Sequence, residues 1–542
     1  MRASHAHLPA SRSKETNMSE STFSADLTDD DADREWISTG IPGLDEILRG
    51  GLPKDFVYLI QGDPGAGKTT LAMQFLLAGD RNGEKGLYLT LSESAREIRS
   101  VASSHRWDVS RLDIYEQLVG EDLLRHERET TMFHPAEVEL GKTIDALLKE
   151  VDRVQPQRVV LDSLSEIRLL SQSTFRYRRQ ILALKEFFSS RKMTVLLLDD
   201  RTESSNDLQL HSVPHGVILL ERRAPLYGAA RRRLEVVKLR GVGYRGGFHD
   251  FSIVQGGLVV YPRLIAAERR RDYIEPGIPT PRAMEVERRE EQDLGSISSD
   301  VPEIDALLGG GIDRGSSTII LGPAGAGKSS LAAQYATAAA RHGEVAAMFI
   351  FDESRKSLVS RSESIGIGLK EQIDAGRLTA QQIDPAELPP GEFAHLVRLA
   401  VEKDGAKMIV IDSLNGYLNA MPEERFLTLH LHELLSYLSE RGVATILVVA
   451  QHGLIGTMSS AIDVSYLADA VLLLRYYETS GRILKAVSVL KRRSGAHETA
   501  IRDFRLTGEG IRIGPPLEQF RGIMSGVPIL NDEPGSTRAG RD

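Results

Sequence analysis

The sequence contains no cysteine in 542 residues. This absence excludes disulfide bonds, thiolate zinc sites and cysteine nucleophiles, and it permits a reducing compartment. No apolar run approaches the ~20 residues that a transmembrane helix requires, and the first residues lack the apolar stretch of a signal peptide. We therefore expect a cytoplasmic protein with no segment in a membrane.

Positive charge is also scarce, because 67 Lys and Arg face 76 Asp and Glu, for a net charge of -9. The chain lacks the positive field that draws proteins to nucleic acid, so nucleic acid is not an expected partner. With 41% hydrophobic and 26% charged residues, the composition is typical of a soluble globular protein. The length exceeds what one hydrophobic core usually organises, which indicates at least two domains.

An internal repeat is the main feature of the chain. The stretch STGIPGLDEILRGGLPKDFVYLIQGDPGAGKTTLA matches SSDVPEIDALLGGGIDRGSSTIILGPAGAGKSSLA. Lys68 and Lys328 hold the same place in the two copies, 260 positions apart (328 − 68), and Asp45 and Asp305 keep that offset. A collinear match of this length indicates duplicated domains rather than two unrelated ones.

Short β-rich apolar runs alternate with amphipathic stretches in both copies, which predicts an α/β fold with a mostly parallel sheet. In the first copy the predicted strands are 56–61, 86–91, 158–162 and 194–199. Charge, proline and the repeat divide the chain into a leader (1–34), a first domain (35–263), a charged linker (264–290), a second domain (291–515) and a C-terminal tail (516–542).

Each copy carries the motif G-x-x-x-x-G-K-[ST] between an apolar strand and a helical stretch. Its glycines let backbone N–H groups point at phosphate oxygens, and the helix presents its positive end to them. Lys68 and Lys328 would bridge the β- and γ-phosphates of ATP, and Thr69 and Ser329 would hold Mg²⁺. The predicted nucleotide-binding residues are Gly62, Asp63, Pro64, Gly65, Ala66, Gly67, Lys68, Thr69 and Thr70 in the first copy and Gly322, Pro323, Ala324, Gly325, Ala326, Gly327, Lys328, Ser329 and Ser330 in the second.

Two apolar runs downstream of the P-loops end in a carboxylate, Asp162 in the first copy and Asp412 in the second. The C-terminal edge of a buried parallel strand faces the crevice in which ligands bind. A carboxylate there can hold Mg²⁺, so we assign Asp162 and Asp412 to the metal site.

The strand after each P-loop helix also ends in acids, of which Glu93 and Glu353 are equivalent. Hydrolysis needs a group that orients or deprotonates the attacking oxygen, and we assign both glutamates to this role. The residues alone leave a second interpretation open, in which these acids only favour the start of a helix.

The chain resembles the KaiC family of circadian clock ATPases and kinases, within the RecA/DnaB-like P-loop superfamily. The resemblance covers 36–530 and rests on STGIPGLDEILRGGLP, FDESR (351–355), KLRG (238–241) and LEQFRGIMSG near the end of the chain. It implies two tandem RecA-like P-loop NTPase domains with mostly parallel central sheets, stacked as two rings of a homohexamer. ATP would lie at subunit interfaces; the first ring would mainly hydrolyse it and the second would autophosphorylate.

By position, the resemblance makes Glu93 and Glu353 the second member of the family's paired catalytic glutamates. The first member is Ser92 in one copy and Asp352 in the other, so the first copy has lost one carboxylate. Basic residues that reach the γ-phosphate of the neighbouring subunit correspond here to Lys238, Arg240, Lys491 and Arg493. From the residues alone, a solvated basic turn after a strand is the alternative for these four.

The family's adjacent phosphoacceptors correspond to Ser465 and Tyr466, and Tyr466 departs from the usual threonine. Ser459 and Ser460 are alternatives nearby, and a structural polar loop is the other interpretation. We expect a hexameric ATPase and serine/threonine autokinase in signalling or timing, with KaiB-like or other signalling proteins as partners. A DNA-dependent recombinase or helicase on the same fold and a nucleotide-gated scaffold are the competing functions.

Overall fold

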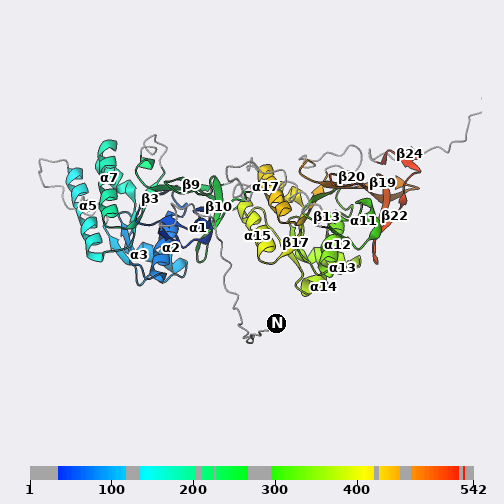
Figure 1. Ribbon diagram of the computed structural model, residues 1–542, viewed down its shortest axis with the longest axis horizontal. Helices are drawn as coiled ribbons and strands as arrows, with labels where there is room; N and C mark the ends of the chain where they lie inside the picture. The colour runs from blue at the N-terminus through cyan, green and yellow to red at the C-terminus, as the bar shows by residue number, and fades with distance from the viewer. Residues whose placement is uncertain are drawn as a thin grey trace, which may run out of the picture.

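The computed structural model describes residues 35–117, 135–201, 210–224, 228–265, 295–419, 427–451, 466–523 and 529–530. They form two lobes that lie side by side along the long axis of the molecule (Figure 1). Each lobe contains one copy of the repeat. The predicted leader, and all of the predicted linker except 264–265, lie outside the described residues.

The first lobe is built on a nine-stranded sheet in the order β11-β10-β9-β8-β3-β7-β6-β4-β5. From β8 to β5 neighbouring strands are parallel, and β9, β10 and β11 extend the sheet with antiparallel pairs. The strands are β3 (Val57–Gly62), β4 (Gly86–Thr90), β5 (Asp113–Glu116), β6 (Arg158–Asp162), β7 (Thr194–Asp200), β8 (Gly216–Arg223), β9 (Arg231–Leu239), β10 (Phe248–Val254) and β11 (Gly257–Tyr261); β1 (Trp36–Ile37) pairs separately with β2 (Leu52–Pro53).

Helices cover both faces of this sheet because successive strand residues point to opposite sides. Tyr58 and Ile60 join the apolar cluster with α1, α2 and α3, while Val57 and Leu59 join the cluster with α5, α6 and α7. The helices are α1 (Pro42–Ile47), α2 (Lys68–Arg81), α3 (Ala95–Ser104), α5 (Pro135–Val154), α6 (Leu164–Ser171) and α7 (Thr174–Ser190).

The second lobe repeats this architecture with a nine-stranded sheet in the order β16-β15-β17-β18-β14-β19-β20-β21-β22. Its strands are β14 (Ser317–Gly322), β15 (Val345–Ile350), β16 (Leu378–Gln382), β17 (Ala406–Asp412), β18 (Ala444–Ala450), β19 (Ala470–Thr479), β20 (Arg482–Arg492), β21 (Arg502–Thr507) and β22 (Gly510–Pro516), with the short pairs β12 (Ser296–Ile297) and β13 (Ile312–Asp313), and β23 (Phe520–Arg521) and β24 (Ile529–Leu530). Its helices are α11 (Pro302–Leu307), α12 (Lys328–Arg341), α13 (Arg355–Ser364), α14 (Leu369–Asp374), α15 (Pro390–Glu402), α16 (Leu414–Asn419) and α17 (Leu427–Glu440).

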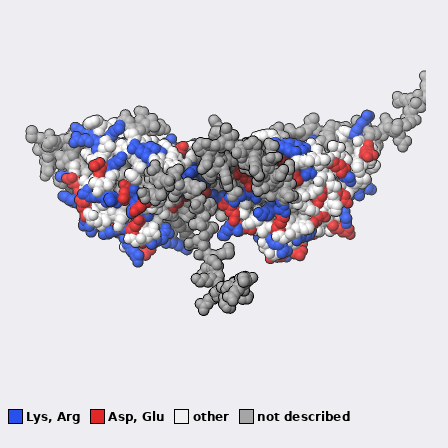
Figure 2. All heavy atoms as spheres, in the orientation of Figure 1, with Lys and Arg blue, Asp and Glu red and all other residues white. Residues whose placement is uncertain are grey.

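The α/β fold with two mostly parallel central sheets is confirmed, and each predicted strand of the first copy coincides with an observed one to within a residue at each end. No described helix combines the length and apolar character that crossing a membrane would need. On the face drawn in Figure 2, basic and acidic side chains are interspersed over both lobes.

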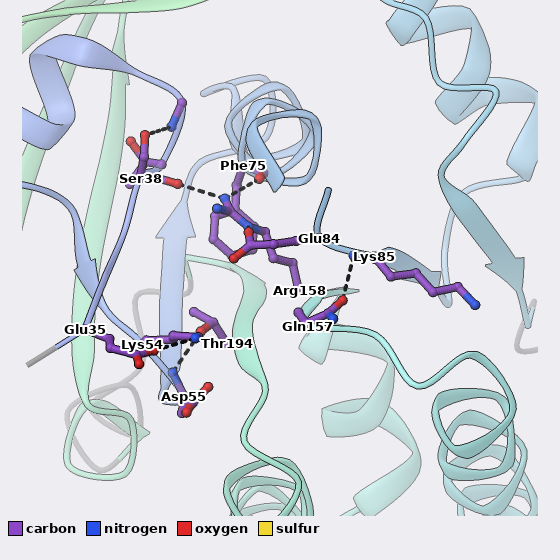
Figure 3. Close-up of polar contacts among 12 residues, drawn as sticks. Glu35, Ser38, Lys54, Asp55, Phe75, Glu84, Lys85, Gln157, Arg158 and Thr194 are labelled. Atoms are coloured by element: carbon purple, nitrogen blue, oxygen red, sulfur yellow. Dashed lines mark hydrogen bonds and ion pairs between the residues drawn. The ribbon is translucent and has the colours of Figure 1, made fainter. Parts of the chain in front are cut away.

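A buried arginine distinguishes the core of the first lobe. The Arg158 side chain on β6 is 1% exposed, and its guanidinium donates to Glu84 at 2.5 Å, to the Ser38 carbonyl at 2.8 Å and to the Phe75 carbonyl at 2.7 Å (Figure 3). It thus joins β6 to α2 and to the segment before α1. The second lobe has the apolar Met408 at the equivalent position, 250 places on (408 − 158), the offset that also separates Asp162 from Asp412.

The two lobes contact each other through polar groups of β10, α1 and α15. The Asp250 carboxylate accepts from the Gly391 backbone N–H at 2.7 Å. Arg398 donates to both carboxylate oxygens of Glu46, at 2.8 and 3.0 Å. These contacts hold the second lobe against the sheet of the first.

Candidate nucleotide sites

The two P-loops have the same backbone conformation. Each leads from a buried strand, β3 or β14, into the first turn of a long helix, α2 or α12. Gly65 and Gly67 have φ values of +73° and +109°, and Gly325 and Gly327 have +75° and +109°. Only glycine adopts these angles without strain, so the glycines of the motif are required by the shape of the loop.

The P-loop lysines lie inside their own loops. Lys68 Nζ donates to the carbonyl oxygens of Gly62 at 2.9 Å and Asp63 at 3.2 Å, and it forms a 2.8 Å ion pair with Asp200 at the end of β7. Lys328 Nζ donates to the Pro323 carbonyl at 2.8 Å, and burial lowers its pKa. Both ammonium groups therefore lie against the backbone of their own P-loops.

The predicted metal residues come together in both lobes. The Thr69 hydroxyl lies near enough to the Asp162 carboxylate to oppose the rise in its pKa, and the Ser329 hydroxyl acts on the pKa of Asp412 in the same way. Burial raises the pKa of Asp162, against the opposing effects of the Tyr88 hydroxyl and Lys68. Burial likewise raises the pKa of Asp412, to about 6.

This donor set fits magnesium. Hydroxyl and carboxylate oxygens are the hard ligands that Mg²⁺ prefers, usually alongside several waters and substrate phosphates. Asp412 Oδ2 is also buried without a hydrogen-bond partner among the described residues, although a buried carboxylate oxygen normally has one. The residues of each lobe could thus hold Mg²⁺ beside the phosphates of a nucleotide.

The two candidate bases have different surroundings. Burial raises the pKa of Glu93, and the nearby charges of Asp162 and Glu97 raise it further. No ion pair joins Glu93 to another described residue. Glu353 instead accepts two hydrogen bonds from Arg361 on α13, at 2.6 and 2.7 Å. The Glu93 carboxylate is therefore the more available of the two to take a proton.

Neither candidate base caps a helix. Ser94 is the N-cap of α3, where its hydroxyl accepts from the Glu97 N–H, and Ser354 is the N-cap of α13. Glu93 and Glu353 precede these caps by one residue, so the helix starts do not need them. Ser92 and Asp352 are exposed, and Asp352 accepts a hydrogen bond from the Ser413 hydroxyl.

The four predicted basic residues bind backbone of their own lobe. Lys238 donates to the His211 carbonyl, and Arg240 donates to the Ser212 carbonyl at 2.6 Å. In the second lobe, Lys491 donates to Ala468 O at 2.8 Å and Arg493 to Tyr466 O at 2.8 Å. Within the described part of the chain, none of the four contacts a P-loop. Burial, with the neighbouring Arg240, lowers the pKa of Lys238 to about 8.

The predicted phosphoacceptors are described only in part. Ser465 and the alternatives Ser459 and Ser460 lie outside the described residues. Tyr466 is 56% exposed.

Three residues that the sequence analysis missed adjoin the sites. They are Tyr88 beside Asp162, Asp200 beside Lys68 and Arg361 beside Glu353. A position-by-position comparison of the two copies would have identified these three residues. In the other copy, each of them is replaced by an apolar residue whose side chain cannot donate a hydrogen bond. The pairs are Tyr88 and Met348, Asp200 and Ala450, and Val101 and Arg361.

Comparison with known proteins agrees with this internal duplication. The family described as "ATPase: KaiC" matches the chain twice, over residues 37–265 and 297–518. The circadian clock protein KaiC3 of Synechocystis sp. is 25% identical over 500 residues, covering 91% of this chain and 95% of its own length. The circadian clock oscillator protein KaiC of Prochlorococcus marinus subsp. pastoris is 26% identical over 504 residues, covering 92% and 94%. With its two RecA-like lobes and two P-loops, the chain belongs to the KaiC ATPase family.

Proposed function

We propose that this chain is a magnesium-dependent ATPase with two sites, whose second lobe is also a serine/threonine autokinase. One observation carries the proposal: each lobe brings a P-loop lysine, a hydroxyl and a buried strand-end carboxylate to one place. An acid lies close to this group in each lobe. The charge of Glu93 raises the pKa of Tyr88, which bonds to Asp162, and the charge of Glu353 raises the pKa of Asp412.

The chain's own residues would divide the work of phosphoryl transfer. Lys68 and the loop N–H groups would hold the β- and γ-phosphates, while Thr69 and Asp162 would hold Mg²⁺, which neutralises phosphate charge. Glu93 would accept a proton from the attacking water as the water oxygen bonds to the γ-phosphorus and the bond from that phosphorus to ADP breaks, and its raised pKa favours that step. In the second lobe Glu353 would do the same for a serine or threonine hydroxyl.

We further propose a homohexamer in which the nucleotide sites lie between subunits. Arg240 and Arg493 support it, because they occupy equivalent exposed positions and contact no P-loop of their own chain in its described part. A cation supplied by a neighbouring subunit would stabilise charge on the transferring phosphoryl group. The relatives are named for circadian clocks, which supports a signalling or timing role, with a KaiB-like protein as one kind of partner.

The test uses the full-length protein, Mg²⁺ and ATP labelled on the γ-phosphate. We expect released phosphate and label on the protein, with label mapped to Ser465 and lost in Ser465→Ala but not in Ser459→Ala. Glu93→Gln should lower phosphate release about 100-fold at the first site, and Glu353→Gln should lower labelling. Unchanged release and labelling in both glutamine variants would show that the bases are assigned wrongly.

The same assay separates the competing functions. Phosphate release that rises on adding single-stranded DNA would favour a recombinase or helicase. Nucleotide-dependent ring assembly without turnover would favour a scaffold.

A further inference from the structure

The first lobe holds its metal carboxylate with a residue that the proposed mechanism does not use. Tyr88 on β4 is fully buried, and its hydroxyl donates to Asp162 Oδ2 at 2.5 Å. The Thr69 hydroxyl lies near the same phenol and lowers its pKa, against the larger effect of burial. Tyr88 thus holds one of the two protein groups proposed to bind Mg²⁺ in this lobe and lies near the other.

Strand register places the tyrosine there. Tyr88 pairs with Val160 across β4 and β6, and Asp162 follows two residues later on the same face of the sheet. In the second lobe Met348 pairs with Val410 in the same register, and Asp412 again follows two residues later. The comparison between Tyr88 and Met348 is therefore fixed by backbone pairing as well as by the repeat.

The second lobe has no counterpart of this hydrogen bond. A methionine thioether has no proton to donate, and Asp412 Oδ2 is buried with no partner among the described residues. The two lobes thus differ at their equivalent carboxylates, since a phenol donates to an oxygen of Asp162 whereas Asp412 Oδ2 has no donor among the described residues.

We propose that Tyr88 is a positioning residue for the metal site of the first lobe, holding Asp162 so that its carboxylate is oriented toward Mg²⁺. The inference rests on the proposed magnesium–ATP site. Metal-binding carboxylates are usually held by a hydrogen bond from a second residue, and loss of such a partner typically costs about 10- to 100-fold in metal affinity. A buried tyrosine needs a hydrogen-bond partner in any fold, so the test must separate metal affinity from stability.

The direct test measures Mn²⁺ binding by electron paramagnetic resonance in the presence of ADP, with Mn²⁺ as the probe for the metal site. The full chain carries Lys328→Ala, so that the first site dominates the titration. Tyr88→Phe, which removes only the hydroxyl, should weaken Mn²⁺ binding about tenfold or more. Tyr115→Phe on the neighbouring strand is the matched control, because its hydroxyl bonds to Gln117 at 3.1 Å, and it should leave Mn²⁺ binding unchanged.

A second readout is the Mg²⁺ dependence of ATP turnover in the same background. Tyr88→Phe should raise the Mg²⁺ concentration for half-maximal turnover about tenfold and leave kcat at saturating Mg²⁺ within about twofold. A tyrosine with only a structural role would lower kcat or stability and leave the Mg²⁺ half-saturation point in place. In the opposite background, Lys68→Ala, the substitution should not change Mn²⁺ binding at the second site.

Tyr88→Met installs the residue of the second lobe and serves as the second variant should Tyr88→Phe fold poorly; it should weaken Mn²⁺ binding to the same degree. Equal Mn²⁺ affinity of a folded Tyr88 variant and its parent would overturn the inference alone. Failure of the parent to bind Mn²⁺ with ADP would overturn the proposed metal site and this inference with it. The Mn²⁺ titration with ADP does not depend on ATP hydrolysis. It therefore tests the role of Tyr88 even in a protein that hydrolyses ATP slowly.

Discussion

The two lobes share one loop conformation but surround it differently. In the first lobe a phenol donates to Asp162, the proposed metal ligand, and Asp200 pairs with the P-loop lysine. In the second lobe Asp412 lacks such a donor, and Arg361 holds the candidate base Glu353. The two copies share the P-loop backbone conformation and differ in the side chains around the proposed metal ligand and the candidate base.

This difference agrees with the roles that we propose for the two lobes. In the first lobe the proposed metal ligand is held by a hydrogen bond, and the candidate base forms no ion pair with another described residue, as steady hydrolysis would require. In the second lobe the base is held by a cation and must be released before it can accept a proton. The following predictions test the comparison, from the largest expected effect to the smallest.

Replacing Arg158 with Met, the residue of the second lobe, should destabilise the first lobe by about 3 kcal/mol. The change removes a buried cation and leaves Glu84 and two carbonyl groups without their donor. Both tryptophans of the chain, Trp36 and Trp107, belong to the first lobe, so fluorescence during urea unfolding reports on that lobe.

Arg191→Met is the control for this stability measurement, because it removes an ion pair with Asp152 at the surface of the same lobe. Such pairs contribute less than about 1 kcal/mol. An Arg158→Met variant no less stable than the control would show that the apolar core of the second lobe works equally well in the first.

Acid should destabilise the first lobe through His249, whose pKa burial lowers to about 4. Its Nδ1 accepts from the Arg263 N–H at 2.9 Å, so the folded lobe holds the neutral ring. Between pH 6.5 and 4 the unfolded chain binds a proton that the folded lobe does not. The free energy of unfolding should therefore fall as pH falls, by about 1 kcal/mol between pH 6.5 and 5.5 from this histidine, where the unfolded chain is still partly deprotonated. Urea unfolding at pH 6.5 and 5.5 measures the change in the free energy of unfolding. In His249→Asn the part of this change that comes from the histidine should vanish. An unchanged pH dependence would show that other groups cause it.

Substituting Arg361 with Val, the residue of the first lobe at this position, should raise turnover at the second site about tenfold. The charged hydrogen bonds to Glu353 contribute on the order of 1.4 kcal/mol against release of the base. Labelling and phosphate release are measured in a Lys68→Ala background. Arg355→Val, at an exposed position on the same helix, is the control. Lower turnover in Arg361→Val would mean that the arginine assists the reaction.

Asp200→Ala, which installs the residue of the second lobe, should tighten ADP binding at the first site about twofold. Asp200 pairs with Lys68 and would compete with phosphate for its ammonium group, and a partly exposed ion pair contributes about 0.5 kcal/mol. Calorimetric titration in a Lys328→Ala background measures the change. Weaker ADP binding would show that Asp200 supports the nucleotide rather than competing with it.

Local patterns were sufficient to predict the fold and the phosphate loops. The P-loop motif, the strand before it and the repeat are each visible in a short window, and β6 begins and ends at the predicted residues. The conformation of Gly67 and Gly327 follows from the motif as well, since the turn requires left-handed angles. Such features depend on neighbours in sequence, which one chain is enough to reveal.

The surroundings of the sites could not be predicted in this way. The hydrogen bond from Tyr88 to Asp162 joins residues 74 positions apart, and only the pairing of β4 with β6 brings them together. Lys68 and Asp200 are farther apart in sequence and meet through the pairing of β3 with β7. A partner across a subunit boundary, as proposed for Arg240, depends on assembly and is encoded by no local pattern.

The most direct test counts the nucleotide that the purified full-length chain retains with Mg²⁺. Two equivalents of adenine nucleotide per chain are expected in the wild type, one in Lys68→Ala, one in Lys328→Ala and none in the double variant. Wild-type protein that binds none, or single variants that still bind two, would contradict the assignment of a nucleotide site to each lobe.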